Sequence, residues 1–337
     1  MSLGEPANGT GRPALSSGQQ RLDVTTRDMH LPRSAAAHAR GQCFQALTPL
    51  PVRPASDAMA GALGTGIGGH SRPMRHPFLE GFRPTLHIAH RGGALLAPEN
   101  TLPAFRAAVD RWRTDMLELD VHATRDGELV VSHDPTLQRC TDGHGRIAEH
   151  SLAELQRLDA GFHFSPDGGR TYPFRGKGVR IPTFQELLRA FPEARLNVEV
   201  KAEAPGIESA VTSLLRSERA TGRVCLGSEL DPLAERLVSA APEVCAFYPR
   251  DALTQLVLAI KSGEEPPDDP RFQVLDMPLD YGEVRLVDAP FLEATNRLGR
   301  WVNVWTIDDP ETMRGLMSIG VGGIMTDRPD LLREVLG

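Results

Sequence analysis

MLELDVHATRDGELVVSHD, residues 116–134, contains two short apolar runs, at 116–121 and 129–133, and each run predicts a β-strand. Glu118 and Asp120 lie two residues apart in the first run. Successive side chains of a strand point to opposite faces, so these two carboxylates share one face. The stretch therefore predicts a strand that carries a pair of acidic groups near its carboxyl end.

Histidines end two of the neighbouring runs. His133 ends the run at 129–133, and His90 ends a similar run, LHIAH at 86–90, with Arg91 directly after it. In a β/α barrel the carboxyl ends of the parallel strands all open on one mouth. We therefore expect two imidazoles, one guanidinium and two carboxylates to meet at such a mouth.

From residue 86 onward, strand patterns alternate with amphipathic helix patterns, which is typical of parallel βα units. We expect an α/β fold, a (β/α)8 TIM barrel. Strands are expected at 86–90, 116–121, 129–133, 195–201, 224–229, 244–249, 273–278, 302–307 and 322–327. These are nine candidates for eight places, and we expect the segment at 273–278 to be the extra piece.

Two parts of the chain break this alternation. Residues 1–77 are rich in Gly, Ala, Ser, Pro and Arg without sustained periodicity, and we expect a disordered or mis-started leader, with an organelle transit peptide as the alternative. Residues 78–337 are expected to form the barrel domain. The polar, glycine-rich residues 134–180 are expected to be a small insertion after the third strand.

The composition excludes several classes of protein. The net charge of −7 gives no reason to expect a nucleic-acid partner. The chain contains no apolar run near the roughly 18 residues that a transmembrane helix needs. Four cysteines occur without a CxxC pair, which favours a reducing compartment, so we expect a cytoplasmic protein.

Glu199 and Lys201 repeat the two-residue spacing in the run NVEVK. Together with Glu118 and Asp120, Glu199 would complete a three-carboxylate site of hard oxygen ligands for a divalent cation, Mg²⁺ or Ca²⁺. Lys201 would then hold a phosphate oxygen. Only three of the 37 basic residues are lysine, so a lysine at this position is notable. The alternatives are a buried ion pair in the barrel floor or exposed charges on a short strand. Two such pairs in apolar runs favour the site, since unpaired charges are costly to bury.

The histidines and Arg91 suit phosphodiester chemistry. Histidine transfers protons near neutral pH, so His90 and His133 are candidates for a catalytic acid–base pair. The planar fork of Arg91 suits bidentate contact with phosphate. His122 shares the strand parity of the acidic pair, but we expect it to lie beyond the strand and assign it no role.

Other residues receive smaller roles. Trp305, near the end of its strand, is expected either to fill the core or to form an apolar wall for a glycerol moiety of the substrate. Asn100 or Thr101 is expected to cap the following helix, and Glu99 to brace the site. Asp327 is expected to be a turn or capping residue.

The combination of motifs resembles the glycerophosphodiester phosphodiesterase family from about residue 86 to 334. The motifs, in chain order, are HRGG, PENT, MLELDVHATRDGELVVSHD, IPTF-x-ELL, NVEVK, VWTIDD and GIMTDRPD. The resemblance implies a β/α barrel with a small insertion after the third strand. It further implies that His90 and His133 are the acid–base pair, Arg91 and Lys201 phosphate ligands, and Glu118, Asp120 and Glu199 ligands of a divalent cation.

The expected reaction is metal-dependent hydrolysis of a glycerophosphodiester to glycerol 3-phosphate and an alcohol. The nucleophile is left open between water and the glycerol 2-hydroxyl. The segment TDMLELDVHATRDG also resembles a branch of the family that acts on lysophospholipids, so a lysophospholipase D is an alternative. The expected substrate is therefore a small phosphodiester or a lysophospholipid. Further alternatives are a phosphatidylinositol-type phospholipase C and a barrel that binds phosphate or metal without catalysis. Retention of both histidines argues against the last of these.

Overall fold

The structure is a computed structural model, and it describes residues 76–201 and 204–337. The predicted leader, residues 1–77, lies outside these residues except for its last two positions, so the leader stays a prediction. Within the described ranges, no helix has the length and apolar character needed to cross a membrane.

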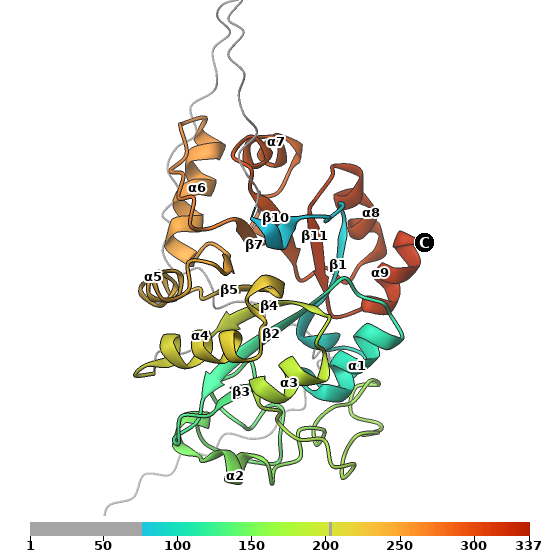
Figure 1. Ribbon diagram of the computed structural model, residues 1–337. Helices are drawn as coiled ribbons and strands as arrows, with labels where there is room; N and C mark the ends of the chain where they lie inside the picture. The colour runs from blue at the N-terminus through green and yellow to red at the C-terminus, as the bar shows by residue number, and fades with distance from the viewer. Residues whose placement is uncertain (1–75, 202–203) are drawn as a thin grey trace, which may run out of the picture. The chain divides into compact units, whose positions relative to one another are not determined.

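Eight parallel strands form a barrel with helices around it, so the predicted (β/α)8 barrel is confirmed (Figure 1). The barrel strands are β1 (Leu86–Ala89), β2 (Met116–Ala123), β4 (Arg195–Val200), β5 (Val224–Gly227), β6 (Cys245–Ala246), β7 (Val274–Pro278), β10 (Trp301–Trp305) and β11 (Gly323–Thr326). Their order around the barrel is β6-β5-β4-β2-β1-β11-β10-β7. A parallel bridge between Phe247 and Val274 joins the two ends of this series, so the barrel is nearly closed.

The helices follow the strands along the chain. They are α1 (Leu102–Asp110), α2 (Leu152–Leu155), α3 (Phe184–Ala190), α4 (Ile207–Ser217), α5 (Asp231–Ala240), α6 (Arg250–Ser262), α7 (Ala289–Arg297), α8 (Pro310–Ser318) and α9 (Pro329–Leu336). Short 3-10 turns occur at Pro77–Leu79 (η1), His90–Gly92 (η2), Ile147–Glu149 (η3) and Thr221–Arg223 (η4). Two buried apolar clusters lie between strands and helices, one centred on β2, β4 and β5 and the other on β7 and β10.

Two strand assignments made from the sequence were wrong. The run at 129–133 forms β3 (Leu129–Val131), which pairs antiparallel with β2 and is not one of the eight barrel strands. The run at 273–278, expected to be the extra piece, is the barrel strand β7. Only five residues connect β2 to β3, and a parallel pair needs a crossover of a dozen or more. The β2–β3 hairpin was the only arrangement that this connection permits.

The insertion after β3 has a small core of its own. Val130 of β3 packs with Leu137, Ile147, Leu155 and Ile181, and all five side chains are buried. The remaining short strands, β8 (Asp280–Tyr281) and β9 (Val284–Arg285), form a separate hairpin in the connection from β7 to α7. The insertion is therefore held beside the barrel mouth by a packed apolar core of its own.

The segment before β1 closes the amino-terminal end of the barrel. Phe78 and Leu79 of η1 are buried against interior side chains of the barrel strands, including Trp301. Further up the interior, Asn197 donates a hydrogen bond to Asp276 at 2.7 Å and Asn303 donates another at 2.8 Å. Burial raises the pKa of Asp276 to about 6, although both hydrogen bonds lower it. This polar layer lies beneath the residues at the mouth.

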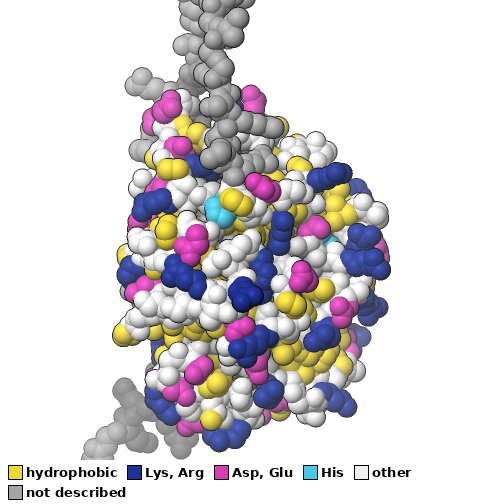
Figure 2. Space-filling model, in the orientation of Figure 1, with side chains coloured by type: hydrophobic (Ala, Val, Ile, Leu, Met, Phe, Trp, Pro, Cys, Tyr) yellow, Lys and Arg dark blue, Asp and Glu magenta, His cyan; other side chains and the backbone are white. Residues whose placement is uncertain are grey.

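On the face shown in Figure 2, basic and acidic side chains are interspersed among polar and apolar ones.

Candidate active site

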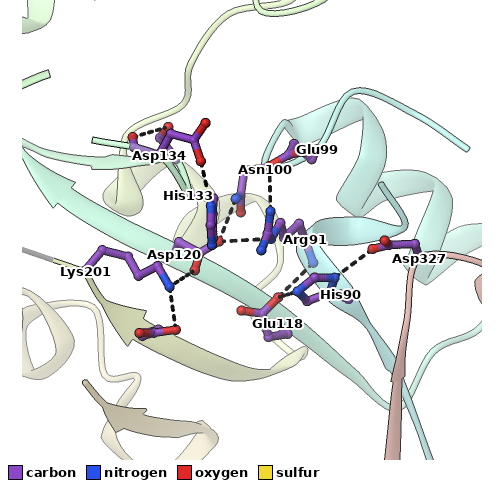
Figure 3. Close-up of polar contacts among 12 residues, drawn as sticks. His90, Arg91, Glu99, Asn100, Glu118, Asp120, His133, Asp134, Lys201 and Asp327 are labelled. Atoms are coloured by element: carbon purple, nitrogen blue, oxygen red, sulfur yellow. Dashed lines mark hydrogen bonds and ion pairs between the residues drawn. The ribbon is translucent and has the colours of Figure 1, made fainter. Parts of the chain in front are cut away.

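The strand register brings the predicted residues together at the carboxyl ends of β1, β2 and β4. Asp120 of β2 is the direct partner of Glu199 of β4, so the two face the same side on adjacent strands. Ala89 of β1 is paired with Thr326 of β11, so the residues that follow, His90 and Asp327, leave the sheet side by side. Figure 3 shows that Arg91 lies between the rings of His90 and His133 in this view.

His90 is oriented by a carboxylate that the sequence did not reveal. Its Nδ1–H donates to Oδ1 of Asp327 at 2.7 Å, and its Nε2 lies 3.9 Å from Oε2 of Glu118. Burial alone would lower the pKa of His90, but Glu118 and Asp327 outweigh it and raise that pKa. With Nδ1 bound to Asp327, Nε2 is the atom of His90 that can exchange a proton with a substrate.

His133 is oriented in the same way by its neighbour in the chain. Its Nδ1–H donates to Oδ1 of Asp134 at 2.8 Å. His122 lies within β2 and not beyond it, and it is buried, contrary to the expectation. Its Nε2–H donates to the backbone carbonyl of His133 at 3.0 Å. His122 therefore supports the backbone that carries His133.

Arg91 is held among acidic groups on a tight turn. Its backbone adopts φ of 51°, and its N–H donates to Oε2 of Glu118 at 2.9 Å. Its Nη1 donates to Glu99 at 3.1 Å, and its Nε lies 3.5 Å from Asp120. The next residue, Gly92, has φ of 83°, and a Cβ there would lie 2.9 Å from the Cβ of Ala104. Glycine is therefore needed for η2 to fit against α1.

Lys201 lies beside the carboxylates of β2 and β4 at the mouth. Lys201 Nζ lies 2.9 Å from Glu199 and 3.6 Å from Asp120. Burial and the nearby Asp120 raise the pKa of Glu118. Burial also raises the pKa of Glu199, although Lys201 lowers it. For Asp120, Lys201 and Arg91 outweigh burial and lower the pKa. The nearby cations therefore offset burial at Asp120, whose pKa falls, but not at Glu118 and Glu199, whose pKa values rise.

These carboxylates suit a divalent cation by their chemistry and position. Among residues 76–201 and 204–337, no three acidic, histidine or cysteine side chains already converge on a common point as metal ligands. Oε1 of Glu199 is nevertheless buried without a hydrogen-bond partner, and a buried carboxylate oxygen requires one. Glu118, Asp120 and Glu199 share one side of the adjacent strands β2 and β4, so their oxygens face the same side of the barrel. The residues present therefore fit the cation that the sequence implies.

Trp305 ends β10 and is partly buried against the interior cluster that contains Met325. It shares strand parity with Asn303, whose side chain lies inside the barrel. The structure places Trp305 at the top of the barrel interior, and both roles expected for it stay predictions.

Two residues of this site, Asp327 and Arg139, were missed or misread in the sequence. Asp327 binds His90 and is not only a turn residue. The predicted cap of α1 is confirmed, and of the two alternatives it is Thr101 and not Asn100. Instead, Asn100 donates to Asp120 at 2.9 Å. Arg139, which received no role, bonds both Glu99 and Asp134. Glu99, expected to brace the site, contacts Arg91 and Arg139.

Comparison with known proteins gives consistent matches over this barrel. The model of the glycerophosphoryl diester phosphodiesterase family matches residues 90–331. A glycerophosphodiester phosphodiesterase of Caldanaerobacter subterraneus is 30% identical over 253 residues, covering 74% of this chain and 96% of that protein. The human lysophospholipase D GDPD1 is 26% identical over 275 residues, covering 74% of this chain and 85% of its own length.

A solved structure shares the fold. The Oleispira antarctica phosphodiesterase, determined in complex with the product sn-glycerol 3-phosphate, aligns with a TM-score of 0.60 and 24% identity. The alignment covers 75% of this chain and 97% of that protein.

Proposed function

Because this chain belongs to the glycerophosphodiester phosphodiesterase family and is a phosphoric diester hydrolase, we propose that it cleaves glycerophosphodiesters to glycerol 3-phosphate and an alcohol by acid–base catalysis between His90 and His133. One observation carries this proposal. Each histidine has its Nδ1 bound to a carboxylate, Asp327 or Asp134, and the two histidines flank Arg91. This arrangement fixes both rings and leaves each Nε2 for proton transfer.

Arg91 and Lys201 bind the phosphodiester. Both side chains are largely buried, with 17% and 13% of their surfaces exposed, and both already contact carboxylates. A phosphodiester carries one negative charge over two oxygens, and the guanidinium of Arg91 can contact both. Lys201 supplies a second positive charge from the other part of the mouth. Together they would orient the phosphorus centre between the two histidines.

Glu118, Asp120 and Glu199 would hold a divalent cation, Mg²⁺ or Ca²⁺, as oxygen ligands. When bound, such a cation would polarise the phosphoryl oxygens and stabilise the negative charge that develops on them. Asn100 and Lys201 would keep Asp120 in place through the contacts they already make with it. Arg91 would keep Glu118 in place through its backbone N–H.

One histidine removes a proton from the nucleophile, at its Nε2. The other donates the proton on its Nε2 to the oxygen of the departing alcohol, so that the alcohol leaves neutral. The carboxylate at each Nδ1 stabilises the imidazolium form of its histidine while it carries the extra proton. Water and the glycerol 2-hydroxyl both stay candidates for the nucleophile: attack by water gives glycerol 3-phosphate directly, whereas attack by the 2-hydroxyl gives a cyclic phosphate that water then opens to glycerol 3-phosphate.

A second candidate function is the release of an alcohol from a lysophospholipid. The human relative is named a lysophospholipase D. In this chain Leu95 is 51% exposed and its backbone N–H donates to the carbonyl of Asp327 at 3.2 Å, so an exposed apolar residue belongs to the segment that contacts Asp327. A lysophospholipid places an acyl chain next to the phosphodiester, and an exposed apolar residue near the mouth would contact it.

The test compares two substrates that share one head group. Glycerophosphocholine and lysophosphatidylcholine are each incubated with the enzyme, with excess chelator and then with added Mg²⁺ or Ca²⁺, and choline release is measured. We expect choline from glycerophosphocholine only when the cation is present. Faster release from lysophosphatidylcholine would favour the second candidate, and release from neither substrate under any condition would contradict the proposed function.

A further inference from the structure

Arg139 joins two acidic residues of the mouth that are far apart in the sequence. Its Nη1 and Nη2 donate to the two oxygens of Glu99 at 2.6 and 2.8 Å. Its Nε and Nη2 donate to the two oxygens of Asp134 at 2.6 and 3.1 Å. The guanidinium therefore makes a bidentate contact with each of two carboxylates, a geometry that its planar fork permits and an ammonium group does not.

The two carboxylates in turn hold the proposed catalytic groups. Oε1 of Glu99 also accepts a hydrogen bond from Arg91 at 3.1 Å. Oδ1 of Asp134 also accepts the hydrogen bond from Nδ1 of His133 at 2.8 Å. The contacts form one continuous series, from Arg91 through Glu99, Arg139 and Asp134 to His133.

The backbone that carries Arg139 is anchored in the insertion. Leu137, two residues earlier, is 2% exposed and packs in the core of the insertion. Thr141, two residues later, donates from both its backbone N–H and its hydroxyl to the carbonyl of Leu137, at 3.0 and 2.8 Å. The guanidinium is thus presented from a fixed turn, although 44% of its side chain remains exposed.

The contacts of Arg139 favour the ionised form of both carboxylates, Glu99 and Asp134. Burial would raise the pKa of Glu99, but Arg139 and Arg91 outweigh it and lower that pKa. Burial would likewise raise the pKa of Asp134, but the hydrogen bonds from His133 and Arg139 outweigh burial and lower that pKa. Without Arg139, each carboxylate would keep a single strong partner, and its side chain would be free to rotate away from its position beside that partner.

We propose that Arg139 is a positioning residue, which fixes the ring of His133 through Asp134 and the guanidinium of Arg91 through Glu99. The proposal rests on the proposed function of His133 and Arg91 and assigns to the insertion a part in the chemistry. The insertion then does more than flank the mouth, because it supplies the group that ties a phosphate ligand to a proton-transfer group.

The test is a double-mutant cycle between Arg139 and His133. Arg139→Gln, His133→Ala and the double variant are assayed for kcat and KM on glycerophosphocholine. We expect Arg139→Gln alone to lower kcat about 10- to 100-fold, the range found when the partners that orient metal-bound histidines are removed. In the His133→Ala background the same change should lower kcat less than about threefold, because the ring that Arg139 orients is gone. The rise in KM that follows from loosening the phosphate ligand Arg91 through Glu99 should persist in that background.

Arg125→Gln is the matched control. Arg125 forms an ion pair with Glu154 and donates a hydrogen bond to the carbonyl of Glu149, and both partners belong to the insertion. The Arg125 side chain is 56% exposed, and these two partners do not contact His90 or His133. We expect this variant to keep the parent kcat. Arg139→Lys should recover only part of the loss, because an ammonium cannot contact both carboxylates in the same way.

The outcomes separate this proposal from the one it rests on. An equal loss of kcat from Arg139→Gln with and without His133 would overturn the positioning role. A parent-like kcat for Arg139→Gln would overturn it as well. If His133→Ala itself keeps the parent kcat, the acid–base assignment fails first, whatever Arg139→Gln does. Thermal unfolding of each variant checks its fold, and if Arg139→Gln unfolds, the cycle is run with Arg139→Lys.

Discussion

Removal of the Asp327 carboxylate tests how His90 is oriented. Its Oδ1 accepts the hydrogen bond from Nδ1 of His90 at 2.7 Å, and the carboxylate is 21% exposed. Hydrogen bonds that involve a charged group contribute about 1.5–3 kcal/mol. Since about 1.4 kcal/mol corresponds to a tenfold change in rate, Asp327→Ala should lower kcat about 10- to 150-fold. KM should change little, because Asp327 does not contact the groups proposed to bind phosphate.

The assay is choline release from glycerophosphocholine at saturating cation, with thermal unfolding measured in parallel. Asp327→Asn should lose less, because an amide oxygen can still accept from Nδ1 although the charge is gone. Asp330→Ala is the control, since Asp330 forms an ion pair with Arg328 in the same segment without contacting His90. A kcat for Asp327→Ala within about threefold of the parent enzyme, at unchanged thermal stability, would refute the orienting role.

Three further predictions concern the cation, the chain boundary and acid stability. Glu118→Gln should weaken binding of Mg²⁺ or Ca²⁺ in a calorimetric titration as well as turnover, and full activity of the parent enzyme in excess chelator would contradict the proposed cation site. A truncated protein that begins at Pro77 should keep its fold and specific activity. One that begins at Thr85 should be destabilised by at least about 3 kcal/mol, because it lacks Phe78, which is only 1% exposed. Equal thermal stability of the two truncated proteins would contradict the boundary. Burial, with a smaller contribution from a nearby arginine, lowers the pKa of His87 to about 4, so the folded state favours its neutral form. The unfolding free energy should therefore fall by up to about 3 kcal/mol as the pH falls from 6.5 to 4, and His87→Leu should flatten that part of the profile measured by urea denaturation; an unchanged profile would argue against this cause.

The barrel and most residues of its mouth could be predicted from the sequence because their signals are local. Paired acidic residues in apolar runs and histidines at strand ends need no knowledge of strand order. The direction of β3 was also available in principle. Asp126-Gly127 lies in the short connection between β2 and β3, and Asp-Gly in a short connection is a strong hairpin signal.

The missed residues depend on contacts between distant segments. Asp327 and His90 lie 237 positions apart, and they meet only because the last strand, β11, pairs with the first, β1. That pairing follows from closure of a barrel, so Asp327 could have been found once closure was assumed. Arg139 and Glu99 meet through the turn of the insertion, which has no repeating pattern. The leader and the cytoplasmic location stay predictions from the sequence.

The central claim is that His90 and His133 divide proton transfer between nucleophile and leaving group. It is tested most directly by the leaving-group dependence of kcat in His90→Ala and His133→Ala, with glycerophosphocholine and a glycerophospho-p-nitrophenyl ester as substrates. A nitrophenolate needs little protonation, so the variant that lacks the general acid should lose about 10²–10⁴-fold on the choline ester and much less on the nitrophenyl ester.

The variant that lacks the general base should lose a similar factor on both esters. His144→Ala, at an exposed histidine of the insertion, is the control and should match the parent enzyme. Equal losses for both histidine variants on both esters would contradict the division of roles. A near-normal rate for either variant on glycerophosphocholine would remove that histidine from the mechanism.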